Sequence, residues 1–350
     1  MTDTLIQAYL PLLLWSGLGL LIFRILPDAF PRMLGRALYW VGVPLEIGVL
    51  ARESEFAQQV GWVPIFAVGA LIGGLLLSWL SLRGLSYWRS RQQATSAHPE
   101  RLPELSLEPS STPVDDQATW AMRSRRGSFI LSSMIGNTGF VGLAIAPVFV
   151  DEQALSWVVL YSVIHNVVGT YGLGVYIASY FGRTASLQTG WLQIRDVLTV
   201  PSLWAFAVGY ASRPISLNPV IETVLHRSIW VVIPMALLLM GMRVSQINGW
   251  KSLKLALLPM TLKIFVLPAM VGLIAVLIGL PAYPRLALVL MSGMPTAFAG
   301  LILAEEYDLD RELIAGSVVL TTGMLLLTIP IWLVLFGNSD PITRGAPLLP

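Results

Sequence analysis

Cysteine is absent from the 350-residue chain, and histidine occurs three times. The missing cysteine excludes disulfides, thiolate catalysis and cysteine-ligated metal sites, although it says nothing about the redox compartment. Charge is also scarce, because Asp, Glu, Lys and Arg make up 12% of the residues, about half of what a soluble domain carries. With 55% hydrophobic residues and a mean hydropathy of +0.71, the composition indicates an all-α polytopic membrane protein.

Other functional classes lack sequence support. The net charge of +2 is too small to indicate nucleic-acid binding. No Ser-His-Asp order, metal-ligand spacing or phosphate-binding loop is present, so we expect neither an enzyme nor a bound metal or cofactor. No Lys or Arg precedes Arg24, so the first apolar run lacks the basic start of a cleaved signal peptide and is expected to be a retained span.

Ten apolar spans are predicted from windows of about 20 residues, the length that crosses a bilayer roughly 30 Å thick. They lie near residues 5–26, 33–51, 60–82, 128–149, 154–181, 197–213, 222–243, 252–279, 285–304 and 312–336, the sixth being short. Between the third and fourth, residues 83–127 are rich in Ser, Pro, Gln and Arg. We expect a mostly disordered loop there.

The loops alternate in charge. About sixteen Lys and Arg residues fall in one set of alternate loops, including 83–127, and five fall in the other. The basic side is expected to face the cytoplasm. In a plasma (inner) membrane protein with ten spans, both termini then lie outside and loop 83–127 is cytoplasmic.

Two of the spans are badly composed for unbroken helices. The stretch from Ser132 to Pro147 carries Gly136, Gly139 and Gly142, each costing a helix roughly 1 kcal/mol relative to Ala, together with Asn137. A second stretch, Met291–Ala304, aligns with it without gaps. The aligned pairs, five of six identical, are Asn137/Pro295, Thr138/Thr296, Phe140/Phe298, Gly142/Gly300, Leu143/Leu301 and Ala146/Ala304. Irregular backbone at membrane depth typically marks a transport site.

Further identities follow the same order in the two halves. They pair residues 40–44 with 230–234, 61–62 with 249–250 and 158–160 with 318–320. Five spans per copy is an odd number, so the second copy enters the membrane from the opposite face, as in secondary transporters with inverted repeats. The predicted units are 1–181, which includes loop 83–127, then 182–336, and a tail at 337–350.

At this point the sequence resembles a known family. The segments GNTGFVGLAIAP (136–147) and MPTAFAGLILAEEYDLDRELIAGSVVLTTGMLLLTIPIWLVLF (294–336) resemble the auxin efflux carrier family, which includes the plant PIN-FORMED carriers and bacterial carriers of malate and malonate type. The resemblance implies a ten-helix, two-repeat fold like that of the bile-acid sodium symporters, with helices four and nine broken and crossing. It also implies export of a small organic anion, either auxin-like or a dicarboxylate.

Two features depart from the plant members of that family. Their long cytoplasmic loop lies between the halves, whereas the long loop here lies inside the first half. Gly136 also stands before Asn137 where the plant members have a proline, while the second stretch keeps Pro295. Regulation through a central loop is therefore not expected.

The substrate-binding candidates lie at the two interruptions. They are Asn137, Thr138, Gly139, Pro295 and Thr296. A break frees backbone N–H groups, and the positive end of a half-helix favours an anion. The alternative is that Asn137 only caps the break.

Four ionisable or polar residues are candidates for coupling or gating. Lys263 and Glu46 lie within apolar spans and could form a salt bridge that rearranges during transport, or each could lie near a membrane interface. His165 and Asn166 could form a proton relay or a satisfied helix–helix contact. The acidic run Glu305, Glu306, Asp308 and Asp310 reads better as a solvated turn than as a cation site.

The sequence thus predicts a secondary transporter that exports a small carboxylate by alternating access at the helix 4/9 crossover. The membrane potential, about 2.3 kcal/mol per charge per 100 mV, would suffice to drive uniport. A sodium- or proton-coupled symporter of the bile-acid type is the alternative, and a non-transporting receptor or scaffold is a third class. The expected partners are the organic anion and the lipid bilayer, with a homodimer left open as the assembly.

Overall fold

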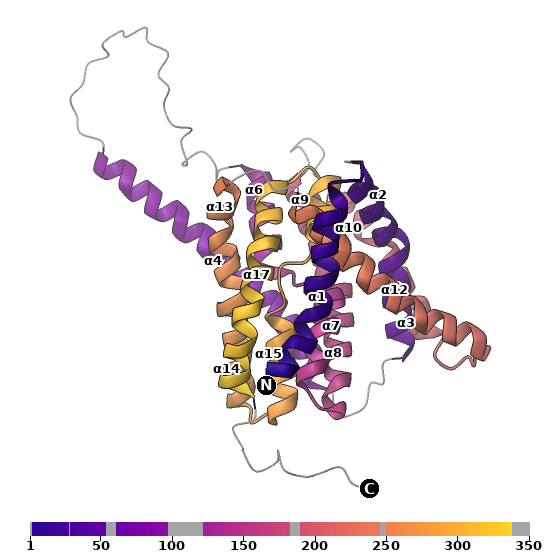
Figure 1. Cartoon of the computed structure of the whole chain (residues 1–350). Helices are drawn as coiled ribbons and strands as arrows, with labels where there is room; N and C mark the ends of the chain where they lie inside the picture. Colours follow the sequence, from indigo (N-terminus) through magenta and orange to yellow (C-terminus); the bar gives the residue numbers. More distant parts are fainter. Residues whose placement is uncertain are drawn as a thin grey trace.

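The computed structural model describes residues 2–27, 29–53, 61–96, 122–182, 190–245 and 250–337. Every regular element within these ranges is helical, and one antiparallel bridge joins Gly136 to Thr296. The helices gather into one bundle, from which the end of α4 (Trp62–Ser96) and the start of α12 (Pro219–Val244) protrude (Figure 1). The predicted all-helical class is therefore confirmed.

Seven helical segments in the described part of the chain are long and apolar enough to cross a membrane. They coincide with seven of the ten predicted spans, namely the first, second, third, fifth, seventh, eighth and tenth. The segments are α1 (Thr2–Phe23), α2–η1–α3 (Phe30–Ala37, Leu38–Gly42, Val43–Glu53), α4, α8–η5–α9 (Glu152–Ile164, His165–Gly174, Val175–Gly182), α12, α13–η7–α14 (Trp250–Thr261, Leu262–Val266, Leu267–Leu277) and α17 (Arg311–Phe336).

The other three predicted spans contain shorter helices. The fourth holds α6 (Arg123–Met134), η3 (Thr138–Gly142), α7 (Leu143–Ile145) and η4 (Ala146–Phe149). The ninth holds α15 (Ala282–Ser292) and α16 (Ala299–Glu306). The sixth holds α11 (Pro201–Ala211), which follows an unexpected helix, α10 (Gly190–Leu198). Both glycine-containing stretches are interrupted where the sequence predicts, between Met134 and Thr138 and between Ser292 and Ala299.

The prediction of a disordered segment over 83–127 is wrong at both of its ends. Helix α4 continues through Ser96, and α6 begins at Arg123. Arginine–aromatic pairs one turn apart support the extension of α4, since the Arg83 guanidinium lies 3.9 Å from the Trp79 ring centroid and that of Arg91 lies 5.7 Å from the Tyr87 ring centroid. Residues 97–121 lie outside the described ranges.

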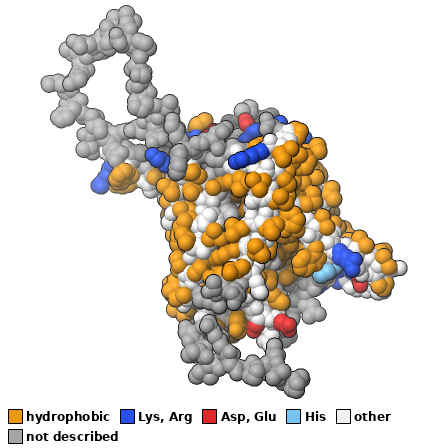
Figure 2. All heavy atoms as spheres, in the orientation of Figure 1, with side chains coloured by type: hydrophobic (Ala, Val, Ile, Leu, Met, Phe, Trp, Pro, Cys, Tyr) orange, Lys and Arg blue, Asp and Glu red, His pale blue; other side chains and the backbone are white. Residues whose placement is uncertain are grey.

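The outside of the bundle is apolar and part of its interior is polar. Large hydrophobic side chains are exposed on many helices, and Figure 2 shows them as a broad band, with the visible Lys and Arg along the upper edge and on the protrusion at the right. Examples are Leu21, Ile65, Trp230, Leu277 and Val334. Polar and charged residues such as Glu46, Asn137, His165 and Lys263 are buried. This distribution fits a helical bundle surrounded by hydrocarbon.

Two helix pairs approach so closely that only glycine fits between them. In the α1–α12 pair, a Cβ added to Gly19 would lie 2.0 Å from the carbonyl oxygen of Leu238. In the α3–α11 pair, a Cβ added to Gly209 would lie 2.2 Å from the carbonyl oxygen of Gly48. Backbone thus packs directly on backbone, as small residues permit in membrane helices.

The helices end at two opposite faces of the bundle. Figure 1 places the start of α1 and the end of α17 at the lower end of the bundle, and the end of α4 at the upper end. The described N- and C-terminal helices therefore begin and finish on the same side, opposite the end of α4.

Candidate transport site

The two helix interruptions, far apart in the sequence, meet inside the bundle. The Asn137 N–H donates to the Pro295 carbonyl at 2.7 Å, and the Ala297 N–H donates to the Ile135 carbonyl at 3.0 Å. These bonds form the antiparallel bridge between Gly136 and Thr296. Each break therefore supplies hydrogen-bond partners for backbone groups that the other break leaves without helical bonds. Backbone groups in the interior of a membrane protein need such partners because hydrocarbon offers none.

Asn137 caps the helical turn that follows the first break. Its Oδ1 accepts the Phe140 N–H at 3.3 Å, and its carbonyl accepts the Gly142 N–H at 3.0 Å. The Nδ2 amide donates no hydrogen bond to the described residues, and the side chain is 6% exposed. The capping alternative is therefore correct as far as Oδ1 is concerned, while two N–H donors of the same side chain remain for a ligand.

The two threonines hold the breaks in different ways. Thr138 Oγ1 accepts from Asn166 Nδ2 at 3.3 Å. Thr296 Oγ1 donates to the Ser132 carbonyl at 2.9 Å, and its N–H donates to Thr321 Oγ1 at 3.0 Å. Thr296 thus ties the second break to α6 and α17. Gly139 and Pro295 are buried in the same region, so the structure brings all five binding candidates together.

Lys263 lies at the junction, fully buried on η7. Its Nζ donates to the Ser292 carbonyl at 2.9 Å, one of the carbonyls that the end of α15 leaves without a helical partner. A Cβ added to Gly136 would lie 2.8 Å from this Nζ. The glycine of the first break therefore leaves the room that the ammonium group occupies.

His165 and Asn166 contact the first break from η5. The Gly136 N–H donates to His165 Nε2 at 2.9 Å, so this nitrogen carries no proton and the imidazole is neutral. Asn166 Nδ2 also donates to the Ser162 carbonyl at 2.9 Å. Both residues thus form interhelical contacts at the first break, while His165 Nδ1 has no hydrogen-bond partner among the described residues.

Glu46 approaches the turn that follows the first break and is 2% exposed. A Cβ added to Gly139 would lie 3.2 Å from Asn166 Nδ2 and 3.4 Å from Glu46 Oε1. Both Glu46 and Lys263 are buried, and no ion pair joins them in the described part of the chain. The Lys263 ammonium group lies beside Gly136, whereas the Glu46 carboxyl lies beside Gly139.

Four wide π-helical turns surround these contacts. Lys263 lies on η7, His165 and Asn166 on η5, and Thr138 on η3. The fourth, η1, carries Tyr39, whose ring packs edge-on against Tyr171 of η5 with centroids 5.9 Å apart. Sequence reasoning missed both tyrosines.

Two of the four π-helical turns could have been predicted from prolines in the sequence. Pro44 and Pro268 each stand two residues after one of them. A proline lacks the N–H that the carbonyl four residues earlier needs, so the turn before it widens. Accordingly, Val43 N–H bonds to the Leu38 carbonyl and Leu267 N–H to the Leu262 carbonyl, five residues back in each case.

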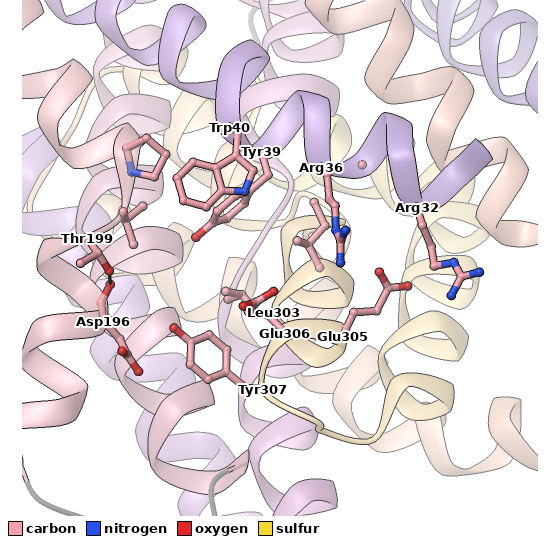
Figure 3. A pocket seen from close by; sticks show the side chains of 14 residues that line it. Arg32, Arg36, Tyr39, Trp40, Asp196, Thr199, Leu303, Glu305, Glu306 and Tyr307 are labelled. Carbon is pink, nitrogen blue, oxygen red and sulfur yellow. Dashed lines mark hydrogen bonds between the residues drawn. The ribbon is translucent and has the colours of Figure 1, made fainter. Parts of the chain in front are cut away.

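A polar pocket of about 280 Å³ opens beside the site between α2–η1, α10–α11 and α16 (Figure 3). Arg32 and Arg36 line one wall, and Glu305 and Glu306 line another. Tyr39, whose ring packs against Tyr171, also lines the pocket. The pocket contains none of the five residues at the breaks.

The acidic run at the end of α16 is only partly the solvated turn that the sequence predicts. Glu305 forms an ion pair with buried Arg243 at 2.7 Å, and Asp310 forms one with Arg125 at 2.6 Å while capping α17. Asp308 is 94% exposed in its side chain and has a φ of 56°. The expectation therefore holds for Asp308 and fails for Glu305 and Asp310.

The second half of the chain is similar to a known family of membrane proteins. A family model described as "Membrane transport protein", which covers the auxin efflux carriers, matches residues 215–333, from just before α12 to near the end of α17. This match and the relatives below support a membrane transporter of this family. The matched region of the transporter includes the second break but not the first.

Two archaeal proteins are similar over most of their length. A protein of Methanocaldococcus jannaschii is 28% identical over 215 residues, which are 59% of this transporter and 67% of the relative. A protein of Methanothermobacter thermautotrophicus is 23% identical over 220 residues, 63% of this transporter and 68% of the relative. Both are described as uncharacterized transporters.

Proposed function

We propose that this multi-pass membrane protein is a non-enzymatic secondary transporter that exports a small organic carboxylate, auxin-like or a dicarboxylate, by alternating access around its two helix breaks. The observation that carries the proposal is the hydrogen bond between Asn137 N–H and the Pro295 carbonyl, which joins the two positions that align between the halves. Beside it, the unpaired Asn137 Nδ2 and the N-terminal end of η3 offer donors suited to a carboxylate.

Helix packing supports the inverted repeat on which alternating access depends. Gly19 and Gly209 are separated by 190 residues, and so are Gly48 and Leu238. The same spacing relates Trp40 to Trp230. The close contact of Gly19 with Leu238 thus has its counterpart in the contact of Gly209 with Gly48, with the roles of the two halves exchanged.

Other helix contacts exchange in the same way. The fifth predicted span packs on the third through α8 and α4, and the tenth packs on the eighth through α17 and α13. The ninth packs on the fifth through α15 and α8, while the fourth packs on the tenth through α6 and α17. This correspondence supports two five-helix units, with the lower ends of α1 and α17 outside and the upper, basic face in the cytoplasm.

The test is Asn137→Asp in purified protein reconstituted into liposomes, with radiolabelled malonate as the probe. An aspartate keeps the oxygen that caps η3 but removes the Nδ2 donors and adds a negative charge. A hydrogen bond to a charged partner contributes about 1.5–3 kcal/mol, so we expect malonate affinity to fall roughly tenfold to a hundredfold or more, with the fold retained.

Asn218→Asp is the matched control. Asn218 is also a helix N-cap, since its Oδ1 accepts the Val220 N–H at 2.9 Å, but it starts the protruding end of α12. The control should transport malonate like the parent protein. Equal transport by Asn137→Asp and the parent would place the substrate elsewhere and contradict the proposal.

A further inference from the structure

We propose that the Glu46 carboxyl is a proton-binding site that must be occupied before an anion binds at the adjacent break, which makes the protein a proton–anion symporter. The inference rests on the proposed function and adds the coupling ion to it. A dicarboxylate that crosses with one proton carries one net negative charge, so the membrane potential still favours its export. The step is the addition of H⁺ to a Glu46 carboxylate oxygen on one side of the membrane and its release as H⁺ on the other. No other bond forms or breaks.

The position of Glu46 is the first support. The side chain projects from α3 to the start of the π-turn that follows Asn137, beside Gly139 and the Asn166 amide. Glu46 Oε1 is buried and has no hydrogen-bond partner among the described residues. A carboxylate with an unpaired buried oxygen pays a large desolvation cost, whereas the neutral acid avoids most of it.

The nearest titratable groups on neighbouring elements supply no cation. Tyr171 of η5 lies close enough to Glu46 to interact with it electrostatically, and Tyr39 of η1 packs against Tyr171. On the same side, His165 is neutral because Nε2 accepts the Gly136 N–H. Tyr161 of α8 stacks on His165. None of these groups balances an ionised Glu46.

The buried and partly buried arginines around α3 are engaged elsewhere, and Arg227 of α12 is exposed. At the outer end of α3, Arg52 pairs with Glu222 of α12 at 3.3 Å and binds carbonyls of the α11–α12 connection. Arg243 of α12 pairs with Glu305. Helix α11 contains no charged residue. Lys263 donates to the Ser292 carbonyl beside Gly136, on the opposite side of the break.

The proton and the anion are then linked by simple electrostatics. Two unit charges 4 Å apart interact by about 4 kcal/mol at the effective dielectric constant of a protein near its surface, and more in a drier site. An ionised Glu46 would therefore repel a carboxylate bound to the donors around Asn137. A protonated Glu46 removes that repulsion, so anion and proton bind together and cross together.

The experiment uses liposomes with malonate inside and outside, an internal pH-sensitive dye, and the membrane potential held at zero by potassium and valinomycin. One proton per anion should drive about tenfold malonate accumulation for each pH unit across the membrane. The isosteric Glu46→Gln protein should still exchange malonate for malonate but should neither accumulate it nor move protons. Glu306→Gln, an exposed acid beside the polar pocket, is the matched control and should behave like the parent.

A second measurement needs no substrate. Infrared spectra of the purified protein at neutral pH should contain a C=O band of a protonated carboxylic acid that is lost in Glu46→Gln and retained in Glu306→Gln. Absence of that band overturns the inference, and so does malonate transport without proton movement by the parent protein. If the parent protein moves no malonate, both the proposed substrate class and its coupling to protons are wrong. The infrared band is measured without substrate, so it shows separately whether Glu46 is protonated.

Discussion

The substitution Gly209→Ala tests whether the two close helix contacts hold the bundle together. The added methyl group would lie 2.2 Å from the Gly48 carbonyl oxygen and 2.9 Å from its carbonyl carbon, far inside the ~3.5 Å at which such atoms pack favourably. Both atoms belong to the backbone, so the contact is relieved only if α3 and α11 move apart. Overpacking of this kind costs about 1–3 kcal/mol.

Helix propensity partly opposes this loss. Alanine stabilises a helix interior by roughly 0.5–1 kcal/mol relative to glycine. We therefore expect a net destabilisation of about 1 kcal/mol, and at most about 2.5 kcal/mol, for Gly209→Ala. Gly69→Ala in α4 is the matched control, because nothing lies within 4 Å of its added Cβ; it should be neutral or slightly stabilising.

The assay is the free energy of unfolding from titration of detergent-purified protein with a denaturing detergent, followed by tryptophan fluorescence. Gly19→Ala should lose about as much as Gly209→Ala, since its Cβ meets the Leu238 carbonyl oxygen at 2.0 Å. A Gly209→Ala protein as stable as Gly69→Ala would refute the close packing of α3 on α11. It would also remove the main packing argument for two equivalent halves.

Two further predictions concern the lysine at the junction and the topology. Lys263→Met should fold, because the loss of the hydrogen bond to the Ser292 carbonyl, about 1–3 kcal/mol, is offset by the removal of a buried charge. The variant should lose malonate transport. Normal malonate transport by this variant would show that Lys263 has no role in the mechanism. Single cysteines at Ser86 and Gln153 in this cysteine-free chain should react with a membrane-impermeant thiol reagent from opposite faces, Ser86 from the cytoplasm, and labelling from one face would end the ten-span arrangement.

The breaks were predictable because composition alone makes a helix unfavourable there. Three glycines and an asparagine within one apolar stretch weaken the helix at Gly136–Asn137, and the aligned stretch around Pro295 does the same. Their meeting was expected from the resemblance to the auxin efflux carrier family, which implies that the two broken helices cross. The sequence therefore led directly to Asn137, Thr138, Gly139, Pro295 and Thr296, which the structure brings together.

The partners of the breaks could not be predicted because they depend on side-chain direction around the wide turns. Lys263 and Glu46 were expected either to pair or to lie at interfaces, yet one contacts the Ser292 carbonyl and the other approaches Gly139. An insertion of one residue into a helical turn rotates every later side chain relative to a regular helix, so periodicity counted from the sequence fails across η1 and η7. The helical continuation of α4 to Ser96 was missed for another reason, since composition does not register arginine–aromatic pairs one turn apart.

The prolines connect these local features to the site. Pro268 removes one N–H from its helix, and the widened turn before it carries Lys263. Pro44 does the same before Glu46, and the widened turn there carries Tyr39. Pro268 thus stands five residues after Lys263, which contacts the first break. Pro44 stands five residues after Tyr39, which packs against Tyr171. The irregular turns are therefore part of how the sequence directs polar groups to the bundle interior, where hydrocarbon offers them no partner.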